Sequence, residues 1–128
     1  MFSRKNNYPT FYTYYGRKIS KKISPLKVNL INKFYDQYSL DESVINYHIS
    51  KKHCKKINIP KYYNKVNIEI GFGNGEFLIK NATSKPEELF IGIEVYVNGI
   101  ARVLSSIVEN KINNIILSNI NSFYFLEA

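Results

Sequence analysis

A glycine-rich stretch in the second half of the chain carries the residue types best suited to holding a ligand. Gly71, Gly73 and Gly75 repeat at every second position, and Glu69 stands two residues before the first of them. Glycines permit positive backbone φ angles and let a ligand lie against bare backbone N–H groups. The spacing disfavours two common phosphate-binding loops, because neither Gly-x-Gly-x-x-Gly nor Gly-Lys-Ser/Thr is present.

A second acidic residue stands at an informative distance from the glycines. Glu94 follows Gly75 by 19 residues and ends a mostly apolar segment. In nucleotide-binding folds an acid about 20 residues beyond the glycines contacts the ribose hydroxyls. A carboxylate accepts two hydrogen bonds and therefore suits a vicinal diol. We predict that Glu94 binds a ribose.

The segments around these residues predict a parallel sheet. Residues 66–70 alternate apolar and polar side chains and predict a strand, and residues 76–83 predict a helix. Residues 88–94 predict a second strand and residues 115–118 a third. Between them, residues 97–111 place apolar side chains on one helical face. The order strand, helix, strand, helix, strand predicts an α/β fold with right-handed crossovers.

The front part of the chain predicts a helix, a break and one undecided segment. Apolar side chains recur at every fourth position and predict a helix over residues 26–38, at Leu26, Leu30, Phe34 and Tyr38. Residues 40–43 predict a break. Residues 44–49 fit a short strand and a short helix equally well, so this choice stays open.

Charge is divided unevenly along the chain. Residues 1–65 hold 14 Lys or Arg and 3 Asp or Glu, whereas residues 66–128 hold 4 and 7. The net charge of +8 therefore resides in the front half and indicates a polyanionic partner. Residues 11–18 mix aromatic and cationic side chains, which suit unpaired bases and phosphates. A solvated basic tail is the alternative for this arm.

Composition excludes several other classes. No apolar run is long enough to cross a membrane, and the N-terminus lacks the apolar core of a signal peptide, so we expect a cytoplasmic protein. Cys54 is the sole cysteine, which rules out an intrachain disulfide. His53 beside it has no partners at zinc spacing, so no metal site is expected.

Together these features resemble the bacterial tRNA (guanine-N7)-methyltransferases, class I enzymes that use S-adenosylmethionine to modify guanine 46 of tRNA. The resemblance rests on residues 14–18, 68–78, 90–96 and 114–115, and on Asn121. It implies a Rossmann-like domain over residues 61–128, preceded over residues 1–60 by a basic arm and a helical extension.

The resemblance also implies roles for individual residues. S-adenosylmethionine would be held by Glu69, Gly71, Gly73, Gly75, Glu94 and Asn121. The family usually has Asp at the position of Asn121, so binding strength is expected to differ. In the arm, Arg17 and Lys18 would contact tRNA.

One departure from the family concerns catalysis. The family's fourth strand and its Phe-Pro-Asp-Pro-Trp-Pro-Lys type motif, which carries a catalytic Asp, do not occur in the sequence. Asp36 and Asp41 are its only aspartates, and both stand far upstream. We therefore expect a C-terminally truncated domain without catalytic residues, and a partner chain covering the open edge of the first strand. Two other hypotheses are a non-catalytic RNA-binding remnant and a nucleotide-binding oxidoreductase domain, the second disfavoured by the glycine spacing.

Overall fold

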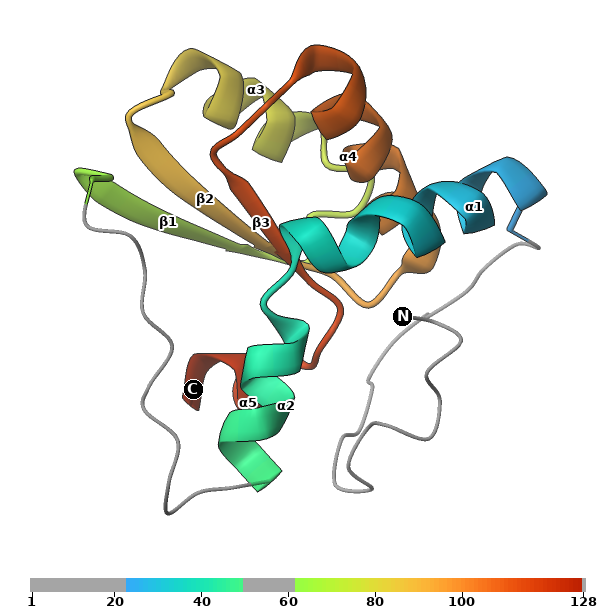
Figure 1. Cartoon of the computed structure of the whole chain (residues 1–128). Helices are drawn as coiled ribbons and strands as arrows, with labels where there is room; N and C mark the ends of the chain where they lie inside the picture. Colours follow the sequence, from blue (N-terminus) through green and yellow to red (C-terminus); the bar gives the residue numbers. More distant parts are fainter. Residues whose placement is uncertain (1–22, 50–61, 128) are drawn as a thin grey trace.

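Three parallel strands form the single sheet of the computed structural model, which describes residues 23–49 and 62–127 (Figure 1). They are β1 (Lys65–Ile70), β2 (Glu88–Ile93) and β3 (Ile115–Ser118), in the spatial order β1-β2-β3. Both pairings are parallel. The predicted α/β class is therefore confirmed, and the strand bounds differ from the predicted ones by one residue at most.

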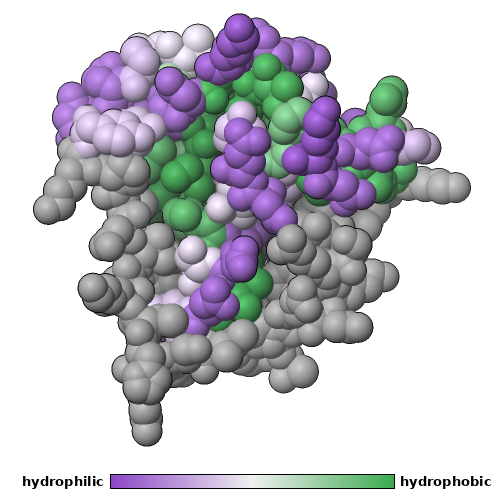
Figure 2. All heavy atoms as spheres, viewed as in Figure 1, coloured by the Kyte–Doolittle hydropathy of each residue, from purple (hydrophilic) through white to green (hydrophobic). Residues whose placement is uncertain are grey.

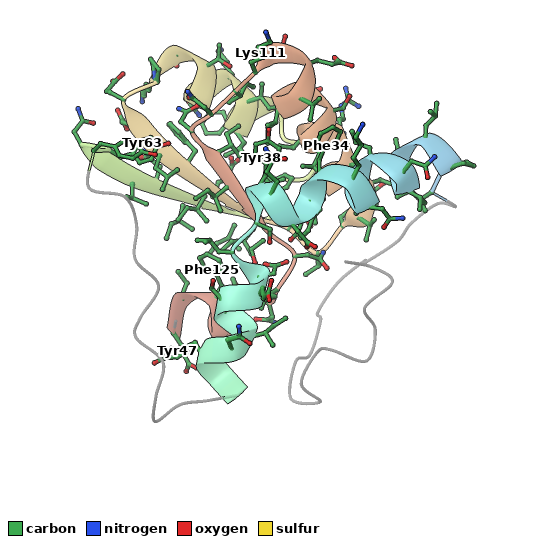
Figure 3. The ribbon with its side chains drawn as sticks, viewed as in Figure 1. Phe34, Tyr38, Tyr47, Tyr63, Lys111 and Phe125 are labelled. Carbon is green, nitrogen blue, oxygen red and sulfur yellow. The ribbon has the colours of Figure 1, made fainter. Side chains whose placement is uncertain are left out.

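Helices cover both faces of this sheet (Figure 1). One face carries α1 (Pro25–Phe34), α3 (Glu76–Ser84) and α4 (Val97–Asn110), whereas the other carries α2 (Asp41–Ile49) and α5 (Ser122–Glu127). Figure 3 shows the same division in side chains, with Phe34 and Tyr38 on the α4 side and Phe125 on the other.

The larger core is built around α4. The periodicity of residues 97–111 predicts one apolar face, at Ile100, Val103, Leu104, Ile107 and Val108. The first four are completely buried and Val108 is partly buried. Each such side chain stabilises the fold by roughly 1.5–3 kcal/mol relative to its exposed state. A second, smaller cluster lies under α2 and α5 and includes Val44, Ile93 and Phe125. Strand β2 is buried on both faces because it contributes to both clusters.

The predicted front helix forms, and its most deeply buried residues stand beside the four that recur at every fourth position. Helix α1 begins where the Ser24 hydroxyl accepts a hydrogen bond from Lys27 N, and it continues into a 3₁₀ turn, η2 (Tyr35–Tyr38). Of the four residues that predict this helix, Leu26 is 82% exposed, whereas Leu30, Phe34 and Tyr38 are partly buried and pack against the core around α4. Ile31 and Tyr35, four residues apart, are the buried pair and pack into the core around α4. Several apolar residues on one short helix allow more than one stripe, and the packing partner selects among them.

The predicted break at residues 40–43 is wrong, because α2 begins at Asp41. The change of direction lies one step earlier, where the Ser39 hydroxyl accepts a hydrogen bond from Asp41 N at 2.9 Å. Asp41 and Glu42 stand in the first turn of α2, where the helix dipole favours negative charge. The open choice for residues 44–49 is settled as helix.

Strand β1 lies at an edge of the sheet. Among the described residues it pairs only with β2, whereas β3 also bridges to Ser39. On β1, Val66, Ile68 and Ile70 are 41%, 46% and 56% exposed. Figure 2 shows hydrophobic residues reaching the surface between hydrophilic ones on the face viewed in Figure 1. Within the described ranges, no helix is long and apolar enough to cross a membrane.

Candidate functional site

The glycine turn after β1 adopts backbone conformations that few other residues tolerate. Gly71, Gly73 and Gly75 have φ angles of 72°, 60° and 77°, in the left-handed region that favours glycine. Gly71 N donates a 2.7 Å hydrogen bond to Ile93 O, which ties the turn to the end of β2. The three glycines therefore stand at the three positions of this five-residue turn that have a positive φ angle.

These glycines serve two different purposes. A Cβ atom added at Gly71 or Gly73 would have no heavy atom within 4 Å, so the backbone there faces open space. A Cβ atom at Gly75 would lie 2.1 Å from Val103 Cγ2 on α4. The first two glycines therefore leave backbone accessible to a ligand, whereas Gly75 permits close packing at the start of α3.

The Glu94 carboxylate is held in place by two backbone N–H groups. Its Oε2 accepts a hydrogen bond from Gly73 N at 2.8 Å, and its Oε1 accepts one from Tyr96 N at 3.0 Å. Hydrogen bonds to an ionised acceptor are stronger than neutral ones. Glu94 therefore joins the glycine turn to the segment that enters α4.

A close backbone contact supports the same turn from the other side. A Cβ atom added at Gly99, in the first turns of α4, would lie 2.0 Å from Gly73 O. Glycine inside a helix costs about 1 kcal/mol relative to alanine, and here it permits α4 to approach the turn. Sequence reasoning missed Gly99, although a glycine in an otherwise regular helix is itself a signal of close approach.

A cavity of about 300 Å³ opens at the carboxyl ends of β1 and β2. It is lined by Ile70, Gly71, Glu94, Asn121 and Ser122 among others. Three predicted cofactor residues, Gly71, Glu94 and Asn121, therefore share one cavity, and Gly73 reaches it through its bond to Glu94. The location agrees with the rule that ligands of open α/β sheets bind beyond the carboxyl ends of the strands.

The other predicted site residues are placed differently. Glu69 stands opposite Gly92 in the sheet register and does not line this cavity. Partial burial raises the pKa of its carboxyl group. Arg17 and Lys18 lie outside the described residues, as do His53 and Cys54. Within the described part of the chain, no three His, Cys, Asp or Glu side chains form a group that could hold a metal ion.

Sequence reasoning also missed Asp41, which is distant in the chain but buried at the end of β3. Only 4% of Asp41 is exposed. Its carboxylate accepts hydrogen bonds from the Ser118 hydroxyl at 2.6 Å, from Asn119 N at 3.2 Å and from the Tyr35 hydroxyl. Burial outweighs these bonds and raises the pKa of Asp41 from 3.8 to about 6.

Asn119 extends this network toward the cavity. Its Nδ2 donates to Glu94 O at 3.1 Å and to Val95 O at 3.2 Å. The buried Asp41 carboxylate thereby supports the loop after β3, which carries Asn121, and the backbone of Glu94. No local sequence pattern predicts this role of Asp41, because its partners Ser118 and Asn119 stand 77 and 78 positions away in the chain.

Comparison with known proteins identifies relatives of this chain. A family model described as "Putative methyltransferase" matches residues 63–128. The "Bifunctional methyltransferase" of Rickettsia conorii is 42% identical over 103 residues, which are 80% of this chain and 17% of the relative. The "tRNA (guanine-N(7)-)-methyltransferase" of Nitrobacter hamburgensis is 35% identical over 103 residues, again 80% of this chain and 38% of the relative. The chain thus spans well under half the length of either relative.

Proposed function

Because the chain belongs to this family of methyltransferases, we propose that it binds S-adenosylmethionine and serves methyl transfer to N7 of a guanine, position 46, in tRNA. The observation that carries the proposal is the cavity at the carboxyl ends of the strands, which brings Gly71, Glu94 and Asn121 together. Relatives named as tRNA (guanine-N(7)-)-methyltransferases support the substrate.

The residues of the cavity suit the cofactor. Each Glu94 carboxylate oxygen accepts one backbone hydrogen bond and retains a lone pair for a ribose hydroxyl. The Asn121 Oδ1 accepts a hydrogen bond from Phe123 N at 2.9 Å, and an amide side chain can both donate to and accept from an adenine edge. The open backbone at Gly71 and Gly73 leaves room for the ligand to approach closely.

Glu69 suits the other end of the cofactor. Glu69 stands two residues before Gly71, and partial burial raises the pKa of its carboxyl group. The ammonium group of the methionine part would offset that burial by stabilising the ionised carboxylate. Bound there, S-adenosylmethionine supplies an electrophilic methyl group on its sulfonium.

Guanine N7 needs little chemical assistance from the protein. Its lone pair lies in the plane of the ring and is not protonated, so no general base is required for attack. The task of the chain is to hold the donor in line with N7, and such positioning supplies roughly 7–11 kcal/mol of a reaction barrier. We expect the reaction in the cytoplasm, with Arg17 and Lys18 contacting the tRNA backbone.

Titration calorimetry with S-adenosylhomocysteine, S-adenosylmethionine and NAD tests the cofactor. We expect the two adenosyl sulfur compounds to bind and NAD to bind weakly, since the glycine spacing differs from the dinucleotide fingerprint. Tighter binding of NAD would contradict the methyltransferase proposal.

Transfer of a tritiated methyl group to unmodified tRNA, with a full-length relative as control, tests the reaction. That these 128 residues alone show no turnover stays a prediction. Label at N7 of guanine with this chain alone would contradict it. Binding of tRNA without any binding of S-adenosylhomocysteine would favour the non-catalytic RNA-binding alternative.

The basic arm is tested by the salt dependence of tRNA binding. Replacing both Arg17 and Lys18 with Ala should reduce the slope of log affinity against log salt by roughly 0.7–0.9 for each phosphate that the variant no longer neutralises. Lys80→Gln, on the exposed side of α3, is a matched control. An unchanged slope in the double variant would indicate that the arm does not bind phosphates.

A further inference from the structure

A second and larger cavity, of about 530 Å³, lies at the opposite end of the sheet from the candidate cofactor site. Its walls include Phe34, Gln37, Tyr38, Tyr62, Tyr63 and Lys111, and we call it the aromatic trough. The residues just before β3 and the last turn of α4 contribute to it, so it faces the amino ends of the strands. Its volume falls in the range of about 300–1,000 Å³ that is usual for ligand sites.

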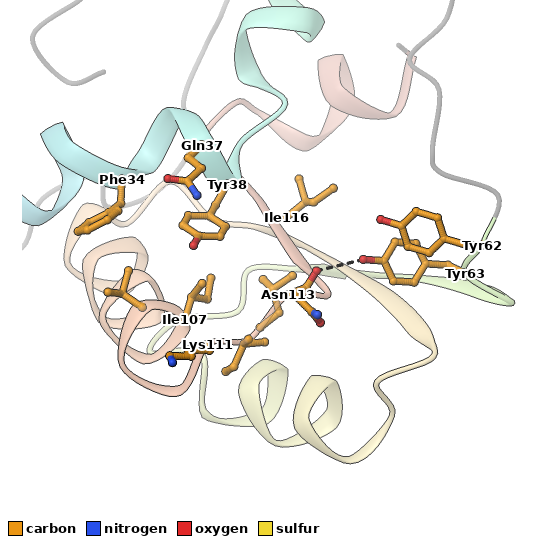
Figure 4. Close-up of a pocket in the computed structure, with 12 residues that line it drawn as sticks. Phe34, Gln37, Tyr38, Tyr62, Tyr63, Ile107, Lys111, Asn113 and Ile116 are labelled. Carbon is orange, nitrogen blue, oxygen red and sulfur yellow. Dashed lines mark hydrogen bonds between the residues drawn. The ribbon is translucent and has the colours of Figure 1, made fainter.

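Aromatic rings stand on two sides of the trough. Figure 4 shows Phe34 and Tyr38, from α1 and η2, to one side of β3, and Tyr62 and Tyr63, next to β1, to the other. Phe34 and Tyr38 pack against the core around α4, whereas Tyr63 and Ile116 pack against the cluster under α2 and α5. The Tyr62 and Tyr63 ring centroids are 4.5 Å apart with the planes tilted by 42°. The Tyr63 hydroxyl donates a hydrogen bond to Asn113 O at 3.0 Å, which attaches this wall to the turn before β3. Tyr62 is 78% exposed, so it offers a ring face to solvent.

The charge of the trough is positive. None of its described lining residues is Asp or Glu, and Lys111 contributes a cation at the end of α4. A second cation stands beside the same wall, because Lys33 Nζ lies 5.2 Å from the centroid of the Phe34 ring. The net charge of the whole chain is +8. An anionic ligand is therefore favoured over a neutral or cationic one.

The polar groups of the trough further restrict the chemical class of ligand that would fit it. The Gln37 amide can donate and accept hydrogen bonds, as the edge of a nucleobase requires. A purely apolar ligand would remove Gln37 and Lys111 from water without replacing their hydrogen bonds, which is costly. An acidic peptide would satisfy the lysines but would offer no flat surface to the tyrosine rings. An unpaired nucleotide satisfies the rings, the amide and the cation together.

We propose that the aromatic trough binds an unpaired nucleotide of an RNA chain, with the base stacked on Tyr62 and a phosphate beside Lys111. That the RNA is tRNA rests on the proposed function, whereas the stacking site does not depend on the cofactor. Because the trough and the cofactor cavity lie at opposite ends of the strands, the proposal makes the trough an anchoring site separate from the place of methyl transfer.

The test uses the full chain and a single-stranded RNA that carries one 2-aminopurine, whose fluorescence falls when the base stacks on an aromatic ring. Tyr62→Ala should weaken binding roughly 10-fold and abolish the quenching, whereas Tyr62→Phe should retain both. Tyr47→Ala is the matched control, because Tyr47 belongs to α2 and does not line the trough (Figure 3).

The phosphate contact is tested separately. Lys111 has a φ of 52°, so Lys111→Asn removes the charge with a residue that tolerates the left-handed conformation. We expect the slope of log affinity against log salt to fall by about 0.7 for a single-stranded RNA. Lys80→Gln, on α3, should leave the slope unchanged.

Two results would overturn the proposal. One is that Tyr62→Ala binds the RNA and quenches its fluorescence as Tyr47→Ala does, while Lys111→Asn has the same salt slope as Lys80→Gln. The other is that a hairpin duplex of the same composition binds as tightly as the single strand, which would show attraction to charge without stacking. Calorimetry with S-adenosylhomocysteine on the same samples reports on the proposed function independently, so the two failures can be told apart.

Discussion

Asp41 and Ser118 stand 77 positions apart in the chain, and the Ser118 hydroxyl donates a 2.6 Å hydrogen bond to the buried Asp41 carboxylate. This bond joins the start of α2 to the end of β3 and crosses the boundary proposed at residue 60. With Asn119 it also connects α2 to the backbone of Glu94. The front segment is therefore part of what holds the candidate cofactor cavity together.

The raised pKa of Asp41 predicts a specific dependence of stability on pH. Its pKa is about 6 when folded and 3.8 when unfolded, so between these values the folded chain binds the proton more tightly. The protonated Asp41 therefore contributes about 3 kcal/mol to the free energy of unfolding below about pH 4, relative to the ionised form. This contribution is lost as the pH rises through 6. Asp41→Asn keeps an oxygen that accepts from Ser118 but does not ionise.

Urea unfolding of the wild type and of Asp41→Asn from pH 4 to 7.5 measures this difference. Other carboxyl groups titrate equally in both chains, so the difference between the two stability curves isolates Asp41. We expect the variant to gain relative stability as pH rises. Parallel curves would contradict a buried carboxyl group with a raised pKa.

Glu94 is predicted to carry much of the cofactor affinity. Glu94→Ala removes the proposed ribose contact and the bonds from Gly73 N and Tyr96 N. We expect binding of S-adenosylhomocysteine to weaken by roughly 1.5–3 kcal/mol, the scale of hydrogen bonds to a charged group. Calorimetry with Glu109→Ala, an exposed acid on α4, is the control. Equal affinities of the two variants for S-adenosylhomocysteine would contradict a role for Glu94 in binding the cofactor.

Gly99 is predicted to be essential for the glycine turn. Gly99→Ala places a methyl group against Gly73 O, a backbone atom that moves only if the turn moves. We expect a loss of roughly 1–3 kcal/mol of stability from overpacking, together with weaker binding of S-adenosylhomocysteine. Ser106→Ala, elsewhere on α4, should behave like the wild type in both measurements. Normal cofactor binding by a folded Gly99→Ala variant would show that the turn adjusts freely.

The edge strand β1 is predicted to drive self-association of the chain. Val66, Ile68 and Ile70 are each more than 40% exposed, on a strand that pairs on one side only within the described residues. Exposed apolar edges favour pairing with other chains, and a charge on them opposes it. Sedimentation velocity should show concentration-dependent association that Ile68→Lys reduces. A monodisperse, cooperatively unfolding monomer would contradict this.

Several features followed from local sequence because their signals are local. The periodicity of residues 97–111 defined α4, since one apolar face needs a repeat near 3.6 residues. The alternating glycines marked a turn, and all three have positive φ because only local sterics decide that preference. Glu94 could be singled out because it ends an apolar strand at a set distance from that turn.

Tertiary structure alone decided which distant residues serve the same place. Asp41 opens a helix near the front of the chain, and no spacing rule links it to Ser118; the folded contact supplies the relation. Gly99 became meaningful because a Cβ atom at that position would lie 2.0 Å from Gly73 O. The exposure of Leu26 and the presence of Tyr38 and Tyr62 in the lining of one cavity likewise depend on which elements pack together. Local sequence patterns determine which segments form helices, strands and turns. Which side chains become buried and which distant residues touch depends on how these elements pack together.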